Sequence, residues 1–151
     1  MEILPYNILT YPNPILDEPS RPVVNVADER IQGVIRKMWV TLDRSREGIG
    51  LAAPQVGIGL RIFIVDTGNL RQTFINPKVI PTDEGVVESI EGCLSFPGKS
   101  CSVPRYLKVQ VKALNEAGNE FVRELEGLPA IVVQHEFDHL EGVVITDYPQ
   151  D

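Results

Sequence analysis

Residues 128–142 read LPAIVVQHEFDHLEG, and this stretch decides how the rest of the chain is interpreted. Its pattern predicts a helix from about Leu128 to Leu140, with Gly142 just beyond the C-terminal end. His135 and His139 are the only two histidines in the sequence. On an α-helix they lie one turn apart, so both imidazoles face the same side.

The HExxH spacing of this segment is typical of a metal site. Two imidazoles one turn apart can bind a single metal ion from one side. Glu136 lies on the flank of that pair, which is a poor position for a ligand and a good one for a general base acting on a metal-bound water. Leu128, Ile131 and Val132 share the stripe of the two histidines, so the pattern predicts an apolar wall beside the metal.

A third ligand has to come from elsewhere in the sequence. Only twelve residues follow His139, and none of them is histidine. Glu141 faces away from the pair, and Asp147 lies almost at the terminus. Cys93 and Cys101, both upstream, are the soft candidates. Gly92 lets the backbone at Cys93 approach a neighbouring element closely, which favours Cys93 as the ligand. Cys101 is better explained as a packed small hydrophobic residue.

The remaining pattern predicts one α+β domain over residues 1–151. The proline-rich start, to about residue 25, is expected to run over the surface in extended form. Residues 31–42 have the spacing of an amphipathic helix, which Asn25 or Asp28 can cap at its start and Gly48 ends near residue 47. Residues 48–125 carry the signals of antiparallel strands, including a run around residues 73–80 that Pro77 breaks.

The segment GIGLAAPQVG, residues 48–57, is rich in small side chains. Such a bare backbone allows a peptide to pair with it as an added strand. Gln55 offers a neutral amide donor, which suits a developing oxyanion. A tight loop with an exposed glutamine is the alternative for this segment taken alone.

Composition excludes several other classes of function. A formal net charge of −7 argues against nucleic-acid binding, which needs clustered Lys and Arg. The sequence contains no apolar run near the roughly 20 residues that span a bilayer. The first residues lack the features of a signal or transit peptide, so a cytoplasmic protein that does not bind membranes is expected.

Three segments together resemble the signature of the peptide deformylase family. GxGLAAxQ stands at residues 48–55, EGCLS at 91–95 and QHExDHLxG at 134–142. The resemblance implies antiparallel β-sheets packed around a central C-terminal HExxH helix, with one amphipathic helix near the N-terminus. It also implies one divalent metal ion held by Cys93 and both histidines. Fe(II) is the favoured ion, and Zn, Ni or Co could take its place.

The resemblance further implies hydrolysis of the formyl group of N-formylmethionyl peptides and nascent chains, with release of formate. Glu136 would take a proton from the attacking water and return it to the departing amine. The side chain of Gln55 and the backbone N–H of Leu94 would stabilise the oxyanion. Arg105 would lie further along the peptide groove. The residues expected around the substrate methionine are Ile49, Gly50, Glu91, Gly92, Leu128, Ile131 and Val132.

The C-terminus departs from the bacterial members of this family, which usually continue into a basic helix implicated in ribosome docking. Here residues 147–151 read DYPQD, so stable ribosome docking is not expected. The protein is expected to be a monomer. A short form of this kind would suit a phage-encoded or otherwise minimal deformylase. An HExxH zinc peptidase and a non-catalytic, metal-stabilised module are the alternatives. Formate release from a formylated peptide distinguishes all three.

Overall fold

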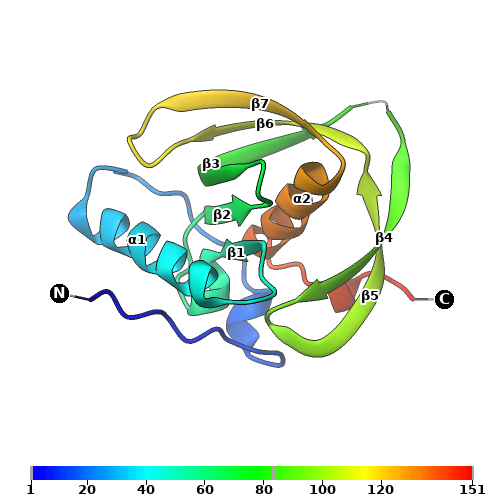
Figure 1. Cartoon of the computed structure of the whole chain (residues 1–151), viewed down its shortest axis with the longest axis horizontal. Helices are drawn as coiled ribbons and strands as arrows, with labels where there is room; N and C mark the ends of the chain where they lie inside the picture. Colours follow the sequence, from blue (N-terminus) through cyan, green and yellow to red (C-terminus); the bar gives the residue numbers. More distant parts are fainter. Residues whose placement is uncertain (1, 83, 151) are drawn as a thin grey trace.

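A computed structural model describes residues 2–82 and 84–150, and it confirms the expected α+β architecture (Figure 1). The helices of these ranges are α1 (Glu29–Arg44) and α2 (Leu128–Leu140), with 3-10 turns η1 (Pro14–Asp17), η2 (Ala53–Val56) and η3 (Ile145–Asp147). The strands are β1 (Gly50–Ala52), β2 (Ile62–Asp66), β3 (Arg71–Pro81), β4 (Val86–Cys93), β5 (Phe96–Tyr106), β6 (Lys108–Leu114) and β7 (Glu120–Glu126). None of the helices in these ranges has the length and apolar character needed to cross a membrane.

Two antiparallel sheets frame the molecule. Five strands pair in the order β1-β2-β3-β6-β7, and β4 and β5 form a separate hairpin. Strand β3 continues through Pro77, where the sequence predicts a break, but its register with β6 shifts between Ile75 and Lys78. Proline has no N–H to donate to the neighbouring strand, so β3 forms a bulge where that hydrogen bond is missing. Beside it, the Asn76 side chain accepts from the backbone N–H of Val23 and donates to the carbonyl of the same residue.

Helix α1 covers one face of the five-stranded sheet. Asp28 caps its first turn by accepting the N–H of Arg30 at 2.8 Å, as the sequence predicts. Ile35, Met38 and Leu42 lie on its buried face. The helix ends at Arg44, three residues before the expected end near residue 47, because the backbone is already extended at Ser45.

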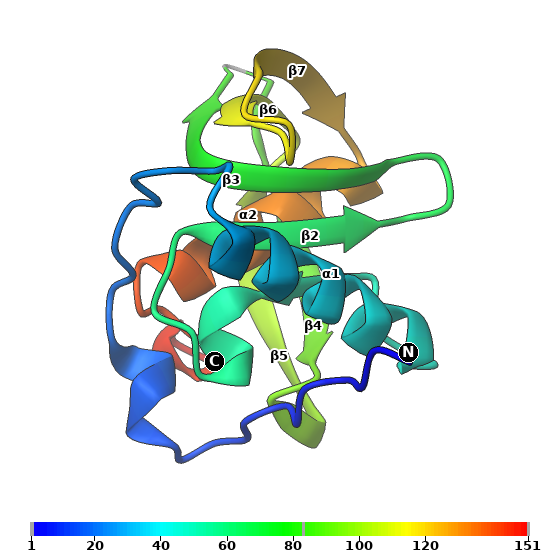
Figure 2. The same ribbon diagram turned by 90° about the vertical axis from the view of Figure 1, so that its left-hand side faces the viewer.

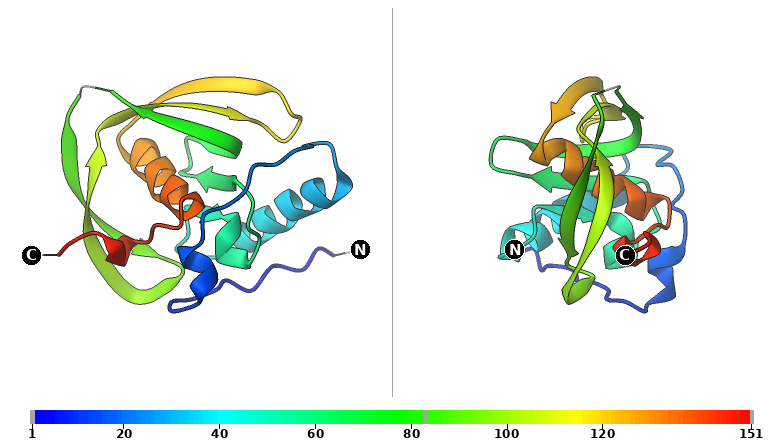
Figure 3. Two further views of the ribbon diagram at one scale, coloured as in Figure 1. Left: turned by 180° about the vertical axis from the view of Figure 1, so that it is seen from behind. Right: turned by 90° about the vertical axis from the view of Figure 1, so that its right-hand side faces the viewer.

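Helix α2 lies between the five-stranded sheet and the β4–β5 hairpin (Figures 1 and 3). It is buried on most sides, which fits its largely apolar sequence. Gly142 follows its end with φ 75°, the left-handed conformation predicted there. The HExxH segment is therefore held in the interior between two sheets.

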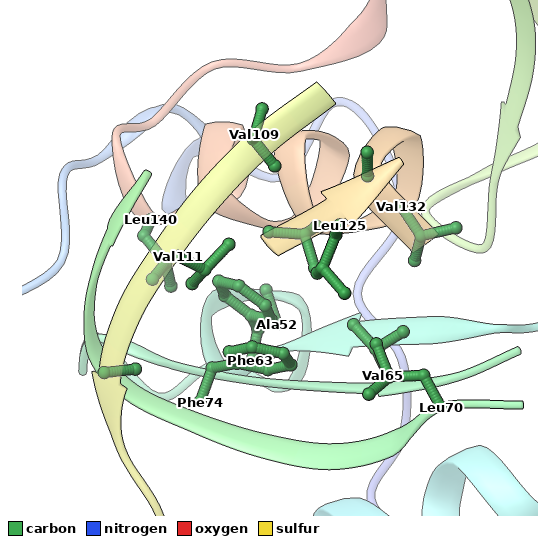
Figure 4. Packing of buried hydrophobic residues seen from close by; sticks show 13 residues of the cluster. Ala52, Phe63, Val65, Leu70, Phe74, Val109, Val111, Leu125, Val132 and Leu140 are labelled. Atoms are coloured by element: carbon green, nitrogen blue, oxygen red, sulfur yellow. The ribbon is translucent and has the colours of Figure 1, made fainter. Parts of the chain in front are cut away.

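The main core fills the space between the sheet and α2. Figure 4 shows Phe63 and Phe74 stacked, with ring centroids 4.8 Å apart, beneath Val132 and Leu140 of α2. The N-terminal segment passes the tip of the β4–β5 hairpin (Figure 2), where the N–H of Tyr11 donates to the carbonyl of Ser95. Core packing holds α2 against the five-stranded sheet. The N-terminal segment connects that side of the molecule to the β4–β5 hairpin.

Candidate metal centre

Three possible metal ligands meet where α2 faces the end of β4. Sγ of Cys93 lies 3.4 Å from Nε2 of His139, and one donor atom from each of Cys93, His135 and His139 falls within 4.8 Å of the others. The two imidazoles are nearly perpendicular, with ring centroids 5.2 Å apart. A sulfur and a nitrogen bound to one tetrahedral ion lie about 3.5 Å apart, given the usual bond lengths. The three residues therefore fit a single metal ion.

A bulge in the hairpin brings Cys93 to this position. Gly92 pairs with Ser100, but Cys93 pairs with Phe96, so residues 97–99 have no partner in the β4–β5 register. Bulges of this kind change the direction of the next side chain. Pro97 lies in this unpaired stretch. Cys101, by contrast, is buried in an apolar cluster and is not part of the group of three ligands.

His135 is supported by a buried carboxylate. Its Nδ1 lies 2.8 Å from Oε1 of Glu91, which also accepts two hydrogen bonds from Arg105. Burial raises the pKa of Glu91, but these hydrogen bonds outweigh it and lower that pKa to about 2. Burial lowers the pKa of His135, yet hydrogen bonds to Cys93 and Glu91 raise it to about 10. An ionised Glu91 holds the proton on Nδ1, and an ion bound at Nε2 would displace the second ring proton.

His139 has a different environment. Its side chain is fully buried, and its Nδ1 has no hydrogen-bond partner in the described part of the chain. Burial lowers its pKa well below the usual value, so the imidazole is neutral with a lone pair available. A neutral imidazole is the form that binds a metal ion.

Glu136 lies beside the ligands as a buried carboxyl group. Its Oε1 has no hydrogen-bond partner within residues 2–82 and 84–150, and burial raises its pKa to about 7. A Cβ on Gly50 would lie 2.6 Å from its Oε2. The glycine that the sequence assigns to substrate pairing thus also makes room for this carboxylate. A pKa near neutrality suits a group that both takes and gives a proton.

Gln55 is buried rather than exposed, and its amide is held in one orientation. Its Oε1 accepts the N–H of Ala52 at 2.9 Å, so its Nε2 faces Ser95 Oγ at 3.2 Å and Cys93 Sγ at 3.6 Å. The donor therefore points at the metal centre. Ser95 was missed as a contributor, although it lies in the same EGCLS motif as Cys93.

A pocket of about 580 Å³ opens beside these groups. His135, Glu136, Gln55 and Cys93 lie in its wall. The wall also includes Leu94 and the following residues expected around the substrate: Ile49, Gly50, Glu91, Gly92, Leu128, Ile131 and Val132.

Arg105 is the exception among the predicted substrate residues. Its side chain is 3% exposed, and it forms ion pairs with Glu91 and Asp138 instead of lining this pocket. The family resemblance implies a place along the groove, and strand spacing alone does not show which way a long side chain turns. Arg105 instead holds Glu91, the carboxylate that contacts His135.

Comparison with known proteins agrees with this geometry. The family model described as polypeptide deformylase matches residues 5–151. The chain is 45% identical to the peptide deformylase of Aquifex aeolicus over 147 residues, covering 93% of this chain and 85% of the relative. It is also 45% identical to that of Clostridium botulinum over 141 residues, covering 93% and 94%.

Solved structures give the same result. The crystal structure of peptide deformylase from Thermotoga maritima has a TM-score of 0.91 and 40% identity, and the match covers 97% of this chain and 99% of that one. A Synechococcus elongatus peptide deformylase in complex with actinonin also has a TM-score of 0.91, with 35% identity, covering 97% and 80%. These relatives come from cellular organisms and do not support the expected phage source. The chain belongs to the polypeptide deformylase family, the hydrolases that remove N-terminal formyl groups from peptides.

Proposed function

We propose that this chain removes the formyl group of N-formylmethionyl peptides at the pocket formed by α2, the β4–β5 hairpin and β1. Cys93, His135 and His139 would hold one divalent ion, which when bound supplies a Lewis acid and activates the attacking water. The observation that carries the proposal is the buried carboxyl group of Glu136, with one oxygen unpartnered in the described residues, beside three converging ligands.

Glu136 is proposed to carry the proton of the reaction. A pKa of about 7 lets the carboxylate accept a proton from water and then deliver it to the departing amine. The carboxyl group is 4% exposed, so bulk water does not compete for it. The hydrogen bond from Ala52 fixes the amide of Gln55, which would point at the reacting carbonyl and stabilise the oxyanion together with the backbone N–H of Leu94.

The apolar wall of the pocket supports methionine as the first residue of the substrate. Ile49 and Leu128 are 39% and 52% exposed although they are large and apolar. An unbranched side chain that covers them would gain about 0.8 kcal/mol for each buried CH₂ group. Ile131 and Val132 continue the wall towards His135, and the small Gly50 and Gly92 leave backbone accessible to a peptide.

The ion is proposed to be Fe(II), as the family resemblance implies. One thiolate and two imidazoles also suit Zn, Co or Ni. The enzyme is expected to act as a monomer on nascent chains in the cytoplasm. Three protein ligands leave a coordination position for chemistry, which a purely structural site would fill with a fourth ligand.

One assay tests the proposal. The chain is loaded anaerobically with Fe(II), and formate release is measured from formyl-Met-Ala-Ser, with acetyl-Met-Ala-Ser and intact casein as controls. We expect formate from the formyl peptide, with poor reaction of the acetyl peptide and no cleavage of casein. A metal-loaded protein that releases no formate, or that deacetylates as fast as it deformylates, would contradict the proposal.

A further inference from the structure

A continuous series of hydrogen bonds leads from the segment after α2 to one metal ligand. Tyr148 Oη donates to Oδ2 of Asp138 at 2.7 Å, and Arg105 Nη1 donates to the same oxygen at 2.7 Å. Arg105 Nε and Nη2 then donate to the two carboxylate oxygens of Glu91 at 2.8 and 2.7 Å. Glu91 Oε1 finally meets Nδ1 of His135 at 2.8 Å.

Three of these groups do not line the substrate pocket. Arg105, Asp138 and Tyr148 line a second, smaller cavity of about 180 Å³, together with Tyr106 and Gln134. The side chains of Arg105 and Glu91 are 3% and 7% exposed, and that of Asp138 is 21% exposed. Water therefore cannot replace these contacts easily, and each charged hydrogen bond constrains the next.

The geometry points to Tyr148 and Asp138 as positioning residues for the ligand His135, an inference that rests on the proposed metal site. Asp138 holds one end of the Arg105 guanidinium, and the tyrosine hydroxyl holds the Asp138 oxygen. The guanidinium is a rigid fork, so it fixes the plane of the Glu91 carboxylate. That plane sets the direction of the His135 ring, as carboxylates behind metal-binding histidines do.

The two histidines differ in this support, which makes the inference specific. Nδ1 of His139 has no hydrogen-bond partner in the residues described, so no hydrogen bond from behind the ligand orients that ring. Nδ1 of His135 depends on Glu91 and, through it, on Arg105. Loss of the Tyr148 hydroxyl should therefore act on the metal through His135.

Tyr148→Phe is the direct test, because it removes one hydroxyl and keeps the ring near Arg105, whose guanidinium carbon is 5.4 Å from the ring centroid. Tyr106→Phe is the matched control: the residue lines the same cavity, and its hydroxyl forms no hydrogen bond within the described ranges. The probe is Co(II), whose dissociation is followed by its visible spectrum during transfer to a chelator. We expect dissociation about 3–10-fold faster for Tyr148→Phe and about 10–100-fold faster for Asp138→Asn, the range for groups behind a ligand. Tyr106→Phe should match the wild type.

Two further measurements separate positioning from packing. In the Zn(II)-loaded protein, the NMR signal of the His135 Nδ1–H should exchange with water faster in Tyr148→Phe, while the signals of the core amides stay unchanged. In a Glu91→Gln background, Tyr148→Phe should add no further increase in the dissociation rate. A wild-type dissociation rate for Tyr148→Phe, or an equal increase in both backgrounds, would overturn the inference. A wild-type chain that binds no Co(II) would instead refute the proposed metal site, and the positioning role with it.

Discussion

Replacing Gly50 with alanine tests the contact between β1 and the proposed general base. The added Cβ would lie 2.6 Å from Oε2 and 2.9 Å from Cγ of Glu136, whereas ordinary van der Waals contact begins at 3.4 Å. The backbone of β1 is held by its pairing with β2, where Gly50 lies opposite Val65. The carboxyl group must therefore move, by about 0.8 Å, and a misplacement near 1 Å costs about 10²-fold in rate.

We expect Gly50→Ala to keep one metal ion per chain, because the three atoms nearest to the new methyl group all belong to Glu136 and not to a ligand. The rate constant kcat for formate release from formyl-Met-Ala-Ser should fall about 10²-fold. Gly33→Ala, in α1, is the control: a Cβ there meets nothing within 4 Å, so kcat should be unchanged. Thermal unfolding of both variants checks that each is folded, since overpacking costs about 1–3 kcal/mol.

Three outcomes would refute the reasoning on Gly50. A normal kcat with metal retained would show that Glu136 tolerates the displacement or does not transfer the proton. Loss of the metal would show that this glycine serves the ligands. An effect confined to KM would assign it to substrate pairing alone.

The remaining predictions follow from the same site. Cys93→Ala should abolish both stoichiometric metal binding and activity, whereas Cys101→Ala should keep both. Metal analysis measures the number of ions per chain, and one ion per chain in Cys93→Ala would contradict the ligand assignment. Glu136→Gln should keep the metal and lose about 10²–10⁴-fold in kcat, so a wild-type rate would exclude proton transfer by this residue. Gln55→Leu should lower kcat about 10²–10³-fold with a smaller change in KM, and the opposite split would make Gln55 an ordinary binding group. With a net charge of −7, the protein should not cosediment with ribosomes at physiological salt, and salt-resistant cosedimentation would refute this.

The sequence predicts those parts of the fold and site that depend on local spacing. The limits of α2, the cap at Asp28 and the turn at Gly142 follow from residue types within one or two helical turns. The placement of His135 and His139 on one face follows from the same periodicity. The choice of a cysteine before α2 as third ligand follows from residue types, because both cysteines are soft donors and both precede the helix.

Other parts depend on contacts between elements that sequence spacing does not reveal. Arg105 lies opposite Val87 in the hairpin register, yet its guanidinium reaches Glu91 four residues along β4. Strand alternation cannot predict that turn of a long side chain. The burial of Gln55 and the contact of Gly50 with Glu136 likewise require α2 to lie against β1 and η2. The sequence predicts that the glycine-rich segment, residues 48–57, pairs with a peptide. The segment also makes room for the side chain of Glu136.

The separate β4–β5 hairpin has a consequence for the local unfolding of the protein. In the described residues this hairpin pairs with no strand of the larger sheet, and it supplies Cys93 while α2 supplies both histidines. An ion bound at all three would cross-link two units that could otherwise separate. Binding would then suppress opening of the hairpin in proportion to the ion's occupancy. Hydrogen exchange should therefore slow selectively at the amides of β4 and β5 as metal is added, while the amides of β2 and β3 keep the protection of the main core.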